Sequence, residues 1–174
     1  MVHYDFHREF RAIYDKALKL FAAGKRDVKE YFSKHELAFL ASIGSRAQDL
    51  YDYAEDATGF GEPDFDTALL IQNVRRSYFL LVQKSEPSKV VLDEAKMPAK
   101  TDAVRSIEWL PRLMPKARAK LRGELPTSLM YDCGGDRRFF KQYDIHPAEF
   151  LQVVWHCGDN DRAIVDWVEQ RGKF

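Results

Sequence analysis

The stretch IEWLPRLMPKARAKLRG occupies residues 107–123, and DCGGDRRFF follows it at residues 132–140. These segments hold one of three tryptophans, the densest basic run and the only Gly-Gly pair of the chain. Pro111 can open a helix, because proline at the first helical position gives up no intrahelical hydrogen bond. We therefore expect a helix from about Pro111 to Arg122, with Pro115 marking a kink or a delayed start.

The residues beyond this helix predict three more. Asp136 can cap the first of them, and Pro147 suits the first position of the second, which Gly158 ends. Asp159 can cap the last helix. The inward faces of these helices carry large aromatic side chains, which we expect to be largely buried. They are Trp109, Phe139, Phe140, Phe150, Trp155 and Trp167.

Helical periodicity also dominates the first part of the chain. The predicted helices cover about residues 6–24, 33–44, 45–54 and 64–81. Ser33 and Glu36 form a capping box, in which each side chain satisfies a free backbone N–H of the first turn. Pro87 and Pro98 then bracket residues 89–93, the only stretch whose composition would suit a short strand.

These patterns predict a mostly α-helical fold, a compact multi-helix bundle with at most a minor short strand. We assign residues 1–85 to an N-terminal helical half, 86–104 to a Pro-bounded connector and 105–174 to a second helical half. The 174 residues suffice for one domain, so we expect the two halves to pack as one unit.

The chain resembles itself at a constant spacing of 100 residues. Apolar positions of FLASIGSRAQDLY, residues 39–51, align with those of FFKQYDIHPAEFL, residues 139–151. Two interpretations stay open. Any pair of capped helices has such a pattern, or the two halves descend from a distant duplication.

Composition narrows the class of protein. The 45% hydrophobic and 31% charged residues are typical of a globular protein, and no apolar run approaches the roughly 20 residues that span a membrane. The N-terminus lacks the features of a signal peptide, and the two cysteines show no metal or disulfide spacing, so we expect a cytoplasmic protein. A net charge of zero makes nucleic-acid binding an unfavoured function.

Charge is unevenly placed along the chain. Residues 47–74 contain seven acids and no Lys or Arg, whereas residues 112–122 contain five basic residues and no acid. Such segregation indicates two separate solvated faces. The alternative is a contact between the acidic and basic faces, within the chain or across a homodimer.

The second half resembles the uncharacterised bacterial family DUF5069 from about residue 105 to 170. The resemblance rests on the motifs Leu110-Pro111-Arg112, Lys116-Ala117-Arg118-Ala119, Tyr131-x-Cys133, Asp136-x-x-Phe139 and Asp166-Trp167-Val168. Gly134-Gly135 stands where the family pattern has Pro-Leu, and Arg137 stands where it has Gln. The resemblance implies no established activity.

Cys133 and Asp136 are the weak candidates for catalysis. The positive end of a helix stabilises a thiolate, the nucleophilic form, and two glycines after Cys133 would let a ligand approach the backbone. The alternative is a small, half-buried residue at a turn. Neither His146 nor His156 is placed beside the thiol by sequence.

Metal and cofactor sites are not expected. His3 and His7 lie one helical turn apart, as do Asp52 and Asp56, but the chain has no Glu-x-x-His motif of the kind that builds di-metal sites between helices. No nucleotide-binding glycine pattern is present either. We therefore predict neither a metal nor a cofactor.

The basic stretch supplies the predicted ligand-binding residues, which are Trp109, Arg112, Lys116 and Arg118. Arginine suits bidentate contact with carboxylate or phosphate, and an adjacent tryptophan could wall the site. The alternative is a solvated helix face. The leading functional hypothesis is a non-enzymatic binding or interaction module for an anionic ligand or an acidic partner surface. The rival is a small enzyme that uses Cys133 or a carboxylate pair in a cleft between the halves.

Overall fold

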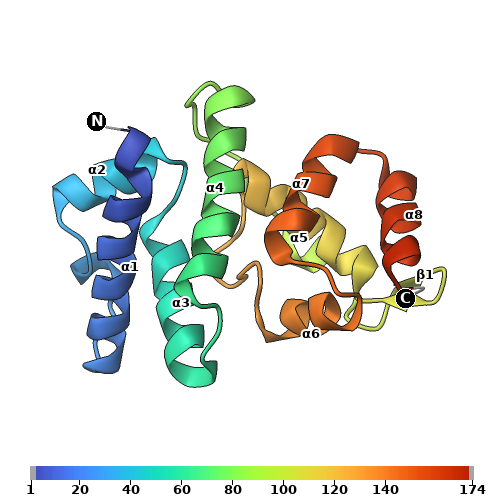
Figure 1. Ribbon diagram of the computed structural model, residues 1–174, viewed down its shortest axis with the longest axis horizontal. Coiled ribbons are helices and arrows are strands. Elements are labelled where there is room, and N and C mark those ends of the chain that lie inside the picture. Colours follow the sequence, from blue (N-terminus) through green and yellow to red (C-terminus); the bar gives the residue numbers. More distant parts are fainter. Residues whose placement is uncertain (1–2, 173–174) are drawn as a thin grey trace. The chain divides into compact units, whose positions relative to one another are not determined.

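The computed structural model describes residues 3–172 and divides into two compact units, Met1–Glu86 (unit 1) and Pro87–Phe174 (unit 2) (Figure 1). Within the described residues, the regular structure consists of eight α-helices, three short 3-10 helices and one two-stranded sheet. The predicted mostly α-helical fold is confirmed. No helix within residues 3–172 has the length and apolar character needed to cross a membrane.

Unit 1 is built from four α-helices. Its elements are η1 (His3–Asp5), α1 (Phe6–Ala22), η2 (Val28–Glu30), α2 (Lys34–Ser42), α3 (Ala47–Phe60) and α4 (Phe65–Leu81). Helix α1 packs against α3 and α4. Its apolar residues recur every three or four positions, so that Phe10, Ile13 and Ala17 lie on one buried face.

The start of α2 follows the predicted capping box. Ser33 Oγ accepts a hydrogen bond from Glu36 N at 3.3 Å, and Ser33 N donates to Glu36 Oε2 at 2.7 Å. Both bonds satisfy N–H groups that the helix itself leaves without partners. The capping box is therefore confirmed.

Unit 2 also contains four α-helices, preceded by a small hairpin. Its elements are η3 (Glu94–Lys96), β1 (Ala103–Val104), β2 (Ile107–Glu108), α5 (Leu110–Arg122), α6 (Gly134–Gln142), α7 (Pro147–Cys157) and α8 (Asp161–Arg171). Helix α5 packs against α7, and α7 packs against α8. Helix α5 runs through Pro115, so the predicted delayed start does not occur.

The predicted position of the strand is wrong. Residues 86–93 form no helix or strand, and β1 pairs with β2 around a turn in which Arg105 and Ser106 both have positive φ. The connector is instead fixed by Leu92 N, which donates to Glu124 O at 2.8 Å. Composition suited to a strand therefore does not produce one where no partner strand lies alongside.

Two predicted caps are displaced along the chain. Cys133, not Asp136, is the N-cap of α6, and Asp136 lies in the first turn. Asn160, not Asp159, caps α8 by accepting a hydrogen bond from Ala163 N at 3.1 Å. In both places several residues of suitable type are adjacent, and the backbone conformation selects one.

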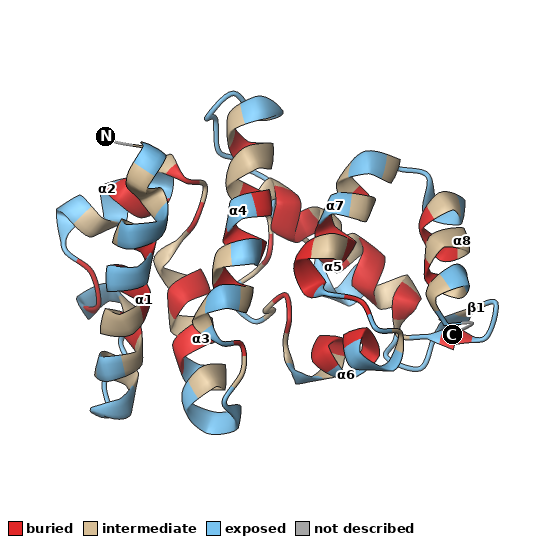
Figure 2. Cartoon of the chain, in the orientation of Figure 1, coloured by how far each residue is buried: buried red, intermediate tan, exposed pale blue. Residues whose placement is uncertain are grey.

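The helices of unit 2 carry both buried and partly buried residues (Figure 2), and its phenylalanines and tryptophans differ in how far they are buried. Phe139, Phe140 and Phe150 are buried as predicted. The tryptophans at 109, 155 and 167 are only partly buried, and the guanidinium of Arg171 covers the ring of Trp167 at 5.3 Å. An indole is large and carries an N–H, so it often keeps one edge at the surface.

Candidate functional site

The candidate site lies within unit 2, around the side chain of Lys116. The buried face of α5 repeats at helical spacing through Leu113, Lys116, Ala117 and Lys120, so Lys116 points inward with the apolar residues. Only 3% of Lys116 is exposed. A buried ammonium requires a partner of opposite charge, and Asp136 on α6 provides it.

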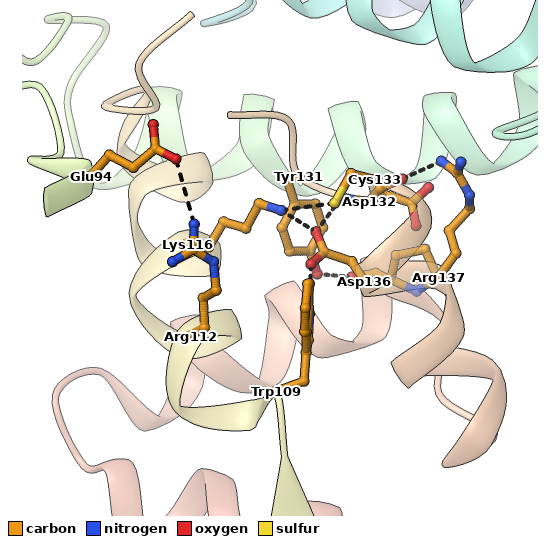
Figure 3. Close-up of polar contacts among 10 residues, drawn as sticks. Glu94, Trp109, Arg112, Lys116, Tyr131, Asp132, Cys133, Asp136 and Arg137 are labelled. Atoms are coloured by element: carbon orange, nitrogen blue, oxygen red, sulfur yellow. Dashed lines mark hydrogen bonds and ion pairs between the residues drawn. The ribbon is translucent and has the colours of Figure 1, made fainter. Parts of the chain in front are cut away.

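Asp136 is the point where several donors meet (Figure 3). Its Oδ2 accepts hydrogen bonds from Lys116 Nζ at 2.7 Å and from the backbone N of Asp132 at 2.9 Å. Its Oδ1 accepts from Trp109 Nε1 at 3.0 Å. These contacts satisfy a fully buried carboxylate and hold α5, α6 and the preceding loop together.

Cys133 lies beside this ion pair. It is half-buried at the N-cap of α6, and Lys116 Nζ donates to its Sγ at 3.2 Å. The thiol makes no capping hydrogen bond within the described residues. Serine, threonine, asparagine or aspartate would cap this helix better than cysteine, so helix capping does not explain a cysteine at this position.

The charge of Lys116 is stable in this environment. Burial by itself lowers the pKa of Lys116, but the electrostatic interactions with Asp136 and Cys133 and the hydrogen bonds to them raise it above its ordinary value. Lys116 therefore acts as a fixed cation next to Cys133 and not as a proton donor.

The indole of Trp109 fills the space beside Gly135. A Cβ at Gly135 would lie 2.3 Å from Cζ2 of this ring, so only glycine fits there. The expectation that both glycines leave room for a ligand is therefore wrong for Gly135. At Gly134 an added Cβ would meet only Arg137 Nη2, at 3.8 Å, and Gly134 is exposed.

The backbone around the site is strained at two points. Trp109 has φ of 69° and Asp132 has φ of 68°, values that residues with a Cβ seldom adopt. Arg137 Nη1 donates a hydrogen bond to Asp132 O and so stabilises the backbone conformation at Asp132. Tyr131 anchors the same loop, since its hydroxyl donates to Pro147 O at 2.8 Å. Such strain persists only where surrounding contacts maintain it.

The remaining predicted ligand-binding residues lie elsewhere. Arg112 Nη1 donates to Pro98 O at 2.9 Å, and Arg112 Nη2 lies 3.6 Å from Glu94 Oε1 (Figure 3). Arg118 donates through Nε and Nη2 to Gly158 O at 3.0 and 2.9 Å. The structure thus brings Trp109 and Lys116 together with Cys133 and Asp136, and places Arg112 and Arg118 in other contacts of unit 2.

Sequence reasoning missed Asp132 and Arg137, which shape the loop before Cys133. It also missed that Lys116 belongs to the buried face of α5. The helical spacing of Leu113, Lys116 and Ala117 carried that signal. Between residues 3 and 172, no group of three or more His, Cys, Asp or Glu side chains is arranged to hold a metal ion.

Comparison with known proteins gives a family match for one part of the chain. The model of DUF5069, a domain of unknown function, matches residues 98–174, which include the whole candidate site. No curated protein and no solved structure matches the chain.

Proposed function

Since residues 98–174 form a DUF5069 domain, we propose that this domain works through Cys133 as a nucleophilic thiol that captures a small electrophile. The observation that carries the proposal is the 3.2 Å contact between Lys116 Nζ and Cys133 Sγ. A thiolate is the reactive form of cysteine, and an adjacent cation at a helix N-terminus stabilises it.

The surroundings of Sγ support this chemistry. Lys116 is held in place by its hydrogen bond to Asp136, so the positive charge is preorganised. The first-turn N–H groups of α6 start at Gly134, which is exposed. N–H groups at a helix start attract developing negative charge on a reacting ligand.

The proposed reaction is a nucleophilic substitution in which Cys133 Sγ attacks the electrophilic atom of the small molecule. The thiol loses its proton to solvent, Sγ then forms a bond to the electrophilic atom, and the leaving group departs with the bonding electron pair. Lys116 keeps its proton throughout because its pKa is raised. Its role is to stabilise negative charge on Sγ before the bond forms.

Alkylation with iodoacetamide at pH 7 tests the proposal directly. Cys157 is also half-buried and serves as the internal reference in the same molecule. We expect Cys133 to be alkylated about tenfold faster than Cys157, as measured by mass spectrometry of peptides over time. Equal and slow rates at the two cysteines would overturn the proposal.

Matched lysine variants identify the source of the reactivity. Lys116→Met should remove the preference for Cys133, while Lys116→Arg should keep part of it by retaining the charge. Lys16→Met is the control, because Lys16 forms a similar ion pair with Glu36 in unit 1, away from either cysteine in sequence. Circular dichroism verifies that each variant is folded.

Binding of an anionic ligand or acidic partner surface by Arg112, Lys116 and Arg118 stays a prediction. A ligand would have to compete with the contacts that these side chains make within unit 2. Calorimetric titration with inorganic phosphate, wild type against Arg112→Ala, tests it. Heats that differ between the two proteins would support the binding module, and identical heats would exclude Arg112 from such a site.

A further inference from the structure

We infer that unit 1 is a second, diverged copy of the fold of unit 2, and that Ser33 occupies in it the position of Cys133. The family match covers residues 98–174, which lie entirely in unit 2. Within the described residues each unit contains four α-helices, α1–α4 in unit 1 and α5–α8 in unit 2 (Figure 1). Helices α2 and α6 both have nine residues, and they begin 100 positions apart, at Lys34 and Gly134.

The turn that follows each of these helices has the same backbone conformation. The C-cap residues Ile43 and Tyr143 both have φ of −103°, and the next residues, Gly44 and Asp144, both have positive φ. The hydrogen bonds repeat as well. Ser45 N donates to Leu40 O and Ile145 N donates to Phe140 O, each at 2.9 Å.

The buried positions of the first helix of each unit also coincide. The buried residues of α1 are Phe10, Ile13, Tyr14 and Ala17, and residues 110, 113, 114 and 117 of α5 are buried too. Leu50 and Phe150, in α3 and α7, are both completely buried. The common spacing of 100 therefore extends over three helices in each unit.

An ion pair is repeated at the same spacing, and this is the observation that general helix patterns do not explain. Lys16 Nζ lies 2.7 Å from Glu36 Oε2, and Lys116 Nζ lies 2.7 Å from Asp136 Oδ2. Each pair joins the first helix of its unit to the third position of the second helix. Apolar periodicity fixes no charged pair between two helices, so a common origin accounts for it better than chance.

The last helices show where the copies diverge. Asp64 caps α4 and Asn160 caps α8, each by accepting a hydrogen bond from the backbone N three residues later. These caps are 96 residues apart, because α7 has 11 residues whereas α3 has 14, and the loop after α7 is one residue shorter than the loop after α3. A shortening near the third helix thus explains why the spacing changes there.

The two copies differ at the residue that caps the second helix. In unit 1, Ser33 Oγ accepts from Glu36 N and performs an ordinary capping function. In unit 2, Cys133 Sγ accepts from Lys116 instead. The Lys16 side chain is 39% exposed, whereas that of Lys116 is 4% exposed. In unit 1 this position therefore only caps a helix, whereas in unit 2 we assign it the reactive thiol.

A reciprocal exchange of the capping residues tests the repeat and does not depend on thiol reactivity. If the positions are equivalent, Cys133→Ser should restore a cap and raise the urea midpoint, and Ser33→Cys should lower it. The double exchange should lie close to the wild type. A lower midpoint for Cys133→Ser would overturn the equivalence of the two positions.

Transplanting the thiol tests the functional part of the inference, which rests on the proposed function. In a Cys133→Ser, Cys157→Ser background, Ser33→Cys with Glu36→Asp places a thiol and a shorter acid beside Lys16. We expect iodoacetamide to react at least about threefold faster with this thiol than with Cys157 in wild type, and Lys16→Met to abolish the excess. A slow rate that does not depend on Lys16 would overturn the assignment. If wild-type Cys133 is itself slow, the proposed function fails and the exchange experiment still decides the repeat.

Discussion

At the scale of single residues, Lys116 and Lys16 show how burial changes the contribution of an ion pair to the free energy of unfolding. Both ammonium groups lie 2.7 Å from a carboxylate, but the Lys116–Asp136 pair is buried and the Lys16–Glu36 pair is partly exposed. Removing one partner of a buried pair leaves the other charge without compensation in the core. In an exposed pair, water replaces much of the lost interaction.

We therefore predict unequal costs for the same substitution. Lys116→Met should destabilise the protein by about 3–5 kcal/mol, and Lys16→Met by about 1 kcal/mol or less. Urea unfolding at pH 7 measures both. Comparable losses for the two variants would show that the Lys116–Asp136 pair is solvated in solution.

Glu36 gives a prediction about pH. Burial by itself raises its pKa, but hydrogen bonds from Lys16 and Ser33 outweigh it, and the pKa of Glu36 is lowered from its ordinary value. A carboxylate with a lowered pKa in the folded state stabilises the protein above its unfolded pKa of about 4.3, and this contribution is lost as the pH falls through the folded value. Glu36→Gln should thus be less stable than wild type at pH 7, with a smaller difference at about pH 3.

The measurement is urea unfolding of both proteins at the two pH values. Glu30→Gln is the control, since Glu30 is an exposed residue of η2. We expect its difference from wild type to be small at both pH values. A Glu36→Gln difference that does not shrink in acid would contradict the proposed cause.

At the scale of elements, the adjacent glycines at the start of α6 have opposite roles. Gly135 is required because the ring of Trp109 occupies the space where a Cβ would lie. At Gly134 a Cβ would make only one ordinary contact, with Arg137 Nη2 at 3.8 Å. In a helix, alanine is favoured over glycine by roughly 0.5–1 kcal/mol where nothing obstructs its Cβ.

We predict that Gly134→Ala stabilises the protein by about 0.5 kcal/mol, whereas Gly135→Ala destabilises it by about 1–3 kcal/mol through overpacking. Gly135→Ala should also displace Trp109 from Asp136 and change its fluorescence. Urea unfolding followed by tryptophan emission measures both effects. If Gly135→Ala were as stable as Gly134→Ala, the indole would not lie against α6.

At the scale of the whole molecule, most of the basic residues that are concentrated in residues 112–122 form ion pairs within unit 2. Four of the five basic residues of α5 take part in the pairs Arg112–Glu94, Lys116–Asp136, Arg118–Asp161 and Arg122–Asp159. In unit 1, Asp49 pairs with Arg46, and Asp52 accepts a hydrogen bond from Gln48. The ion pairs of α5 therefore partly neutralise the basic stretch within unit 2.

We therefore expect the sedimentation coefficient to stay constant between about 0.05 and 0.5 M salt, a range over which exposed charges become strongly screened. Analytical ultracentrifugation tests this. A coefficient that falls as salt rises would instead support a homodimer through the acidic and basic faces. The variant Arg122→Glu should then weaken it, because the Arg122 side chain is 43% exposed.

The sequence by itself determined the helices and most of their ends, because the signals that start and stop a helix act over a few residues. The Ser33–Glu36 capping box, Pro147 at the start of α7 and Gly158 at its end are such signals, and each appears where it was predicted. The 100-residue spacing was also visible in the sequence. Its two explanations could not be separated there, because apolar periodicity is common to all packed helices.

Only the tertiary structure decided which side chains of unit 2 meet. Lys116 and Cys133 are 17 residues apart. Lys116 lies in α5 and Cys133 is the N-cap of α6, so their contact depends on how α5 and α6 pack. The same holds for Arg112, whose hydrogen bond to Pro98 O joins α5 to a residue 14 positions earlier in the chain. Helix periodicity specifies the inner face of one helix, but the partner of a buried charge is set by long-range packing, and that packing placed the thiol of Cys133 beside the ammonium of Lys116.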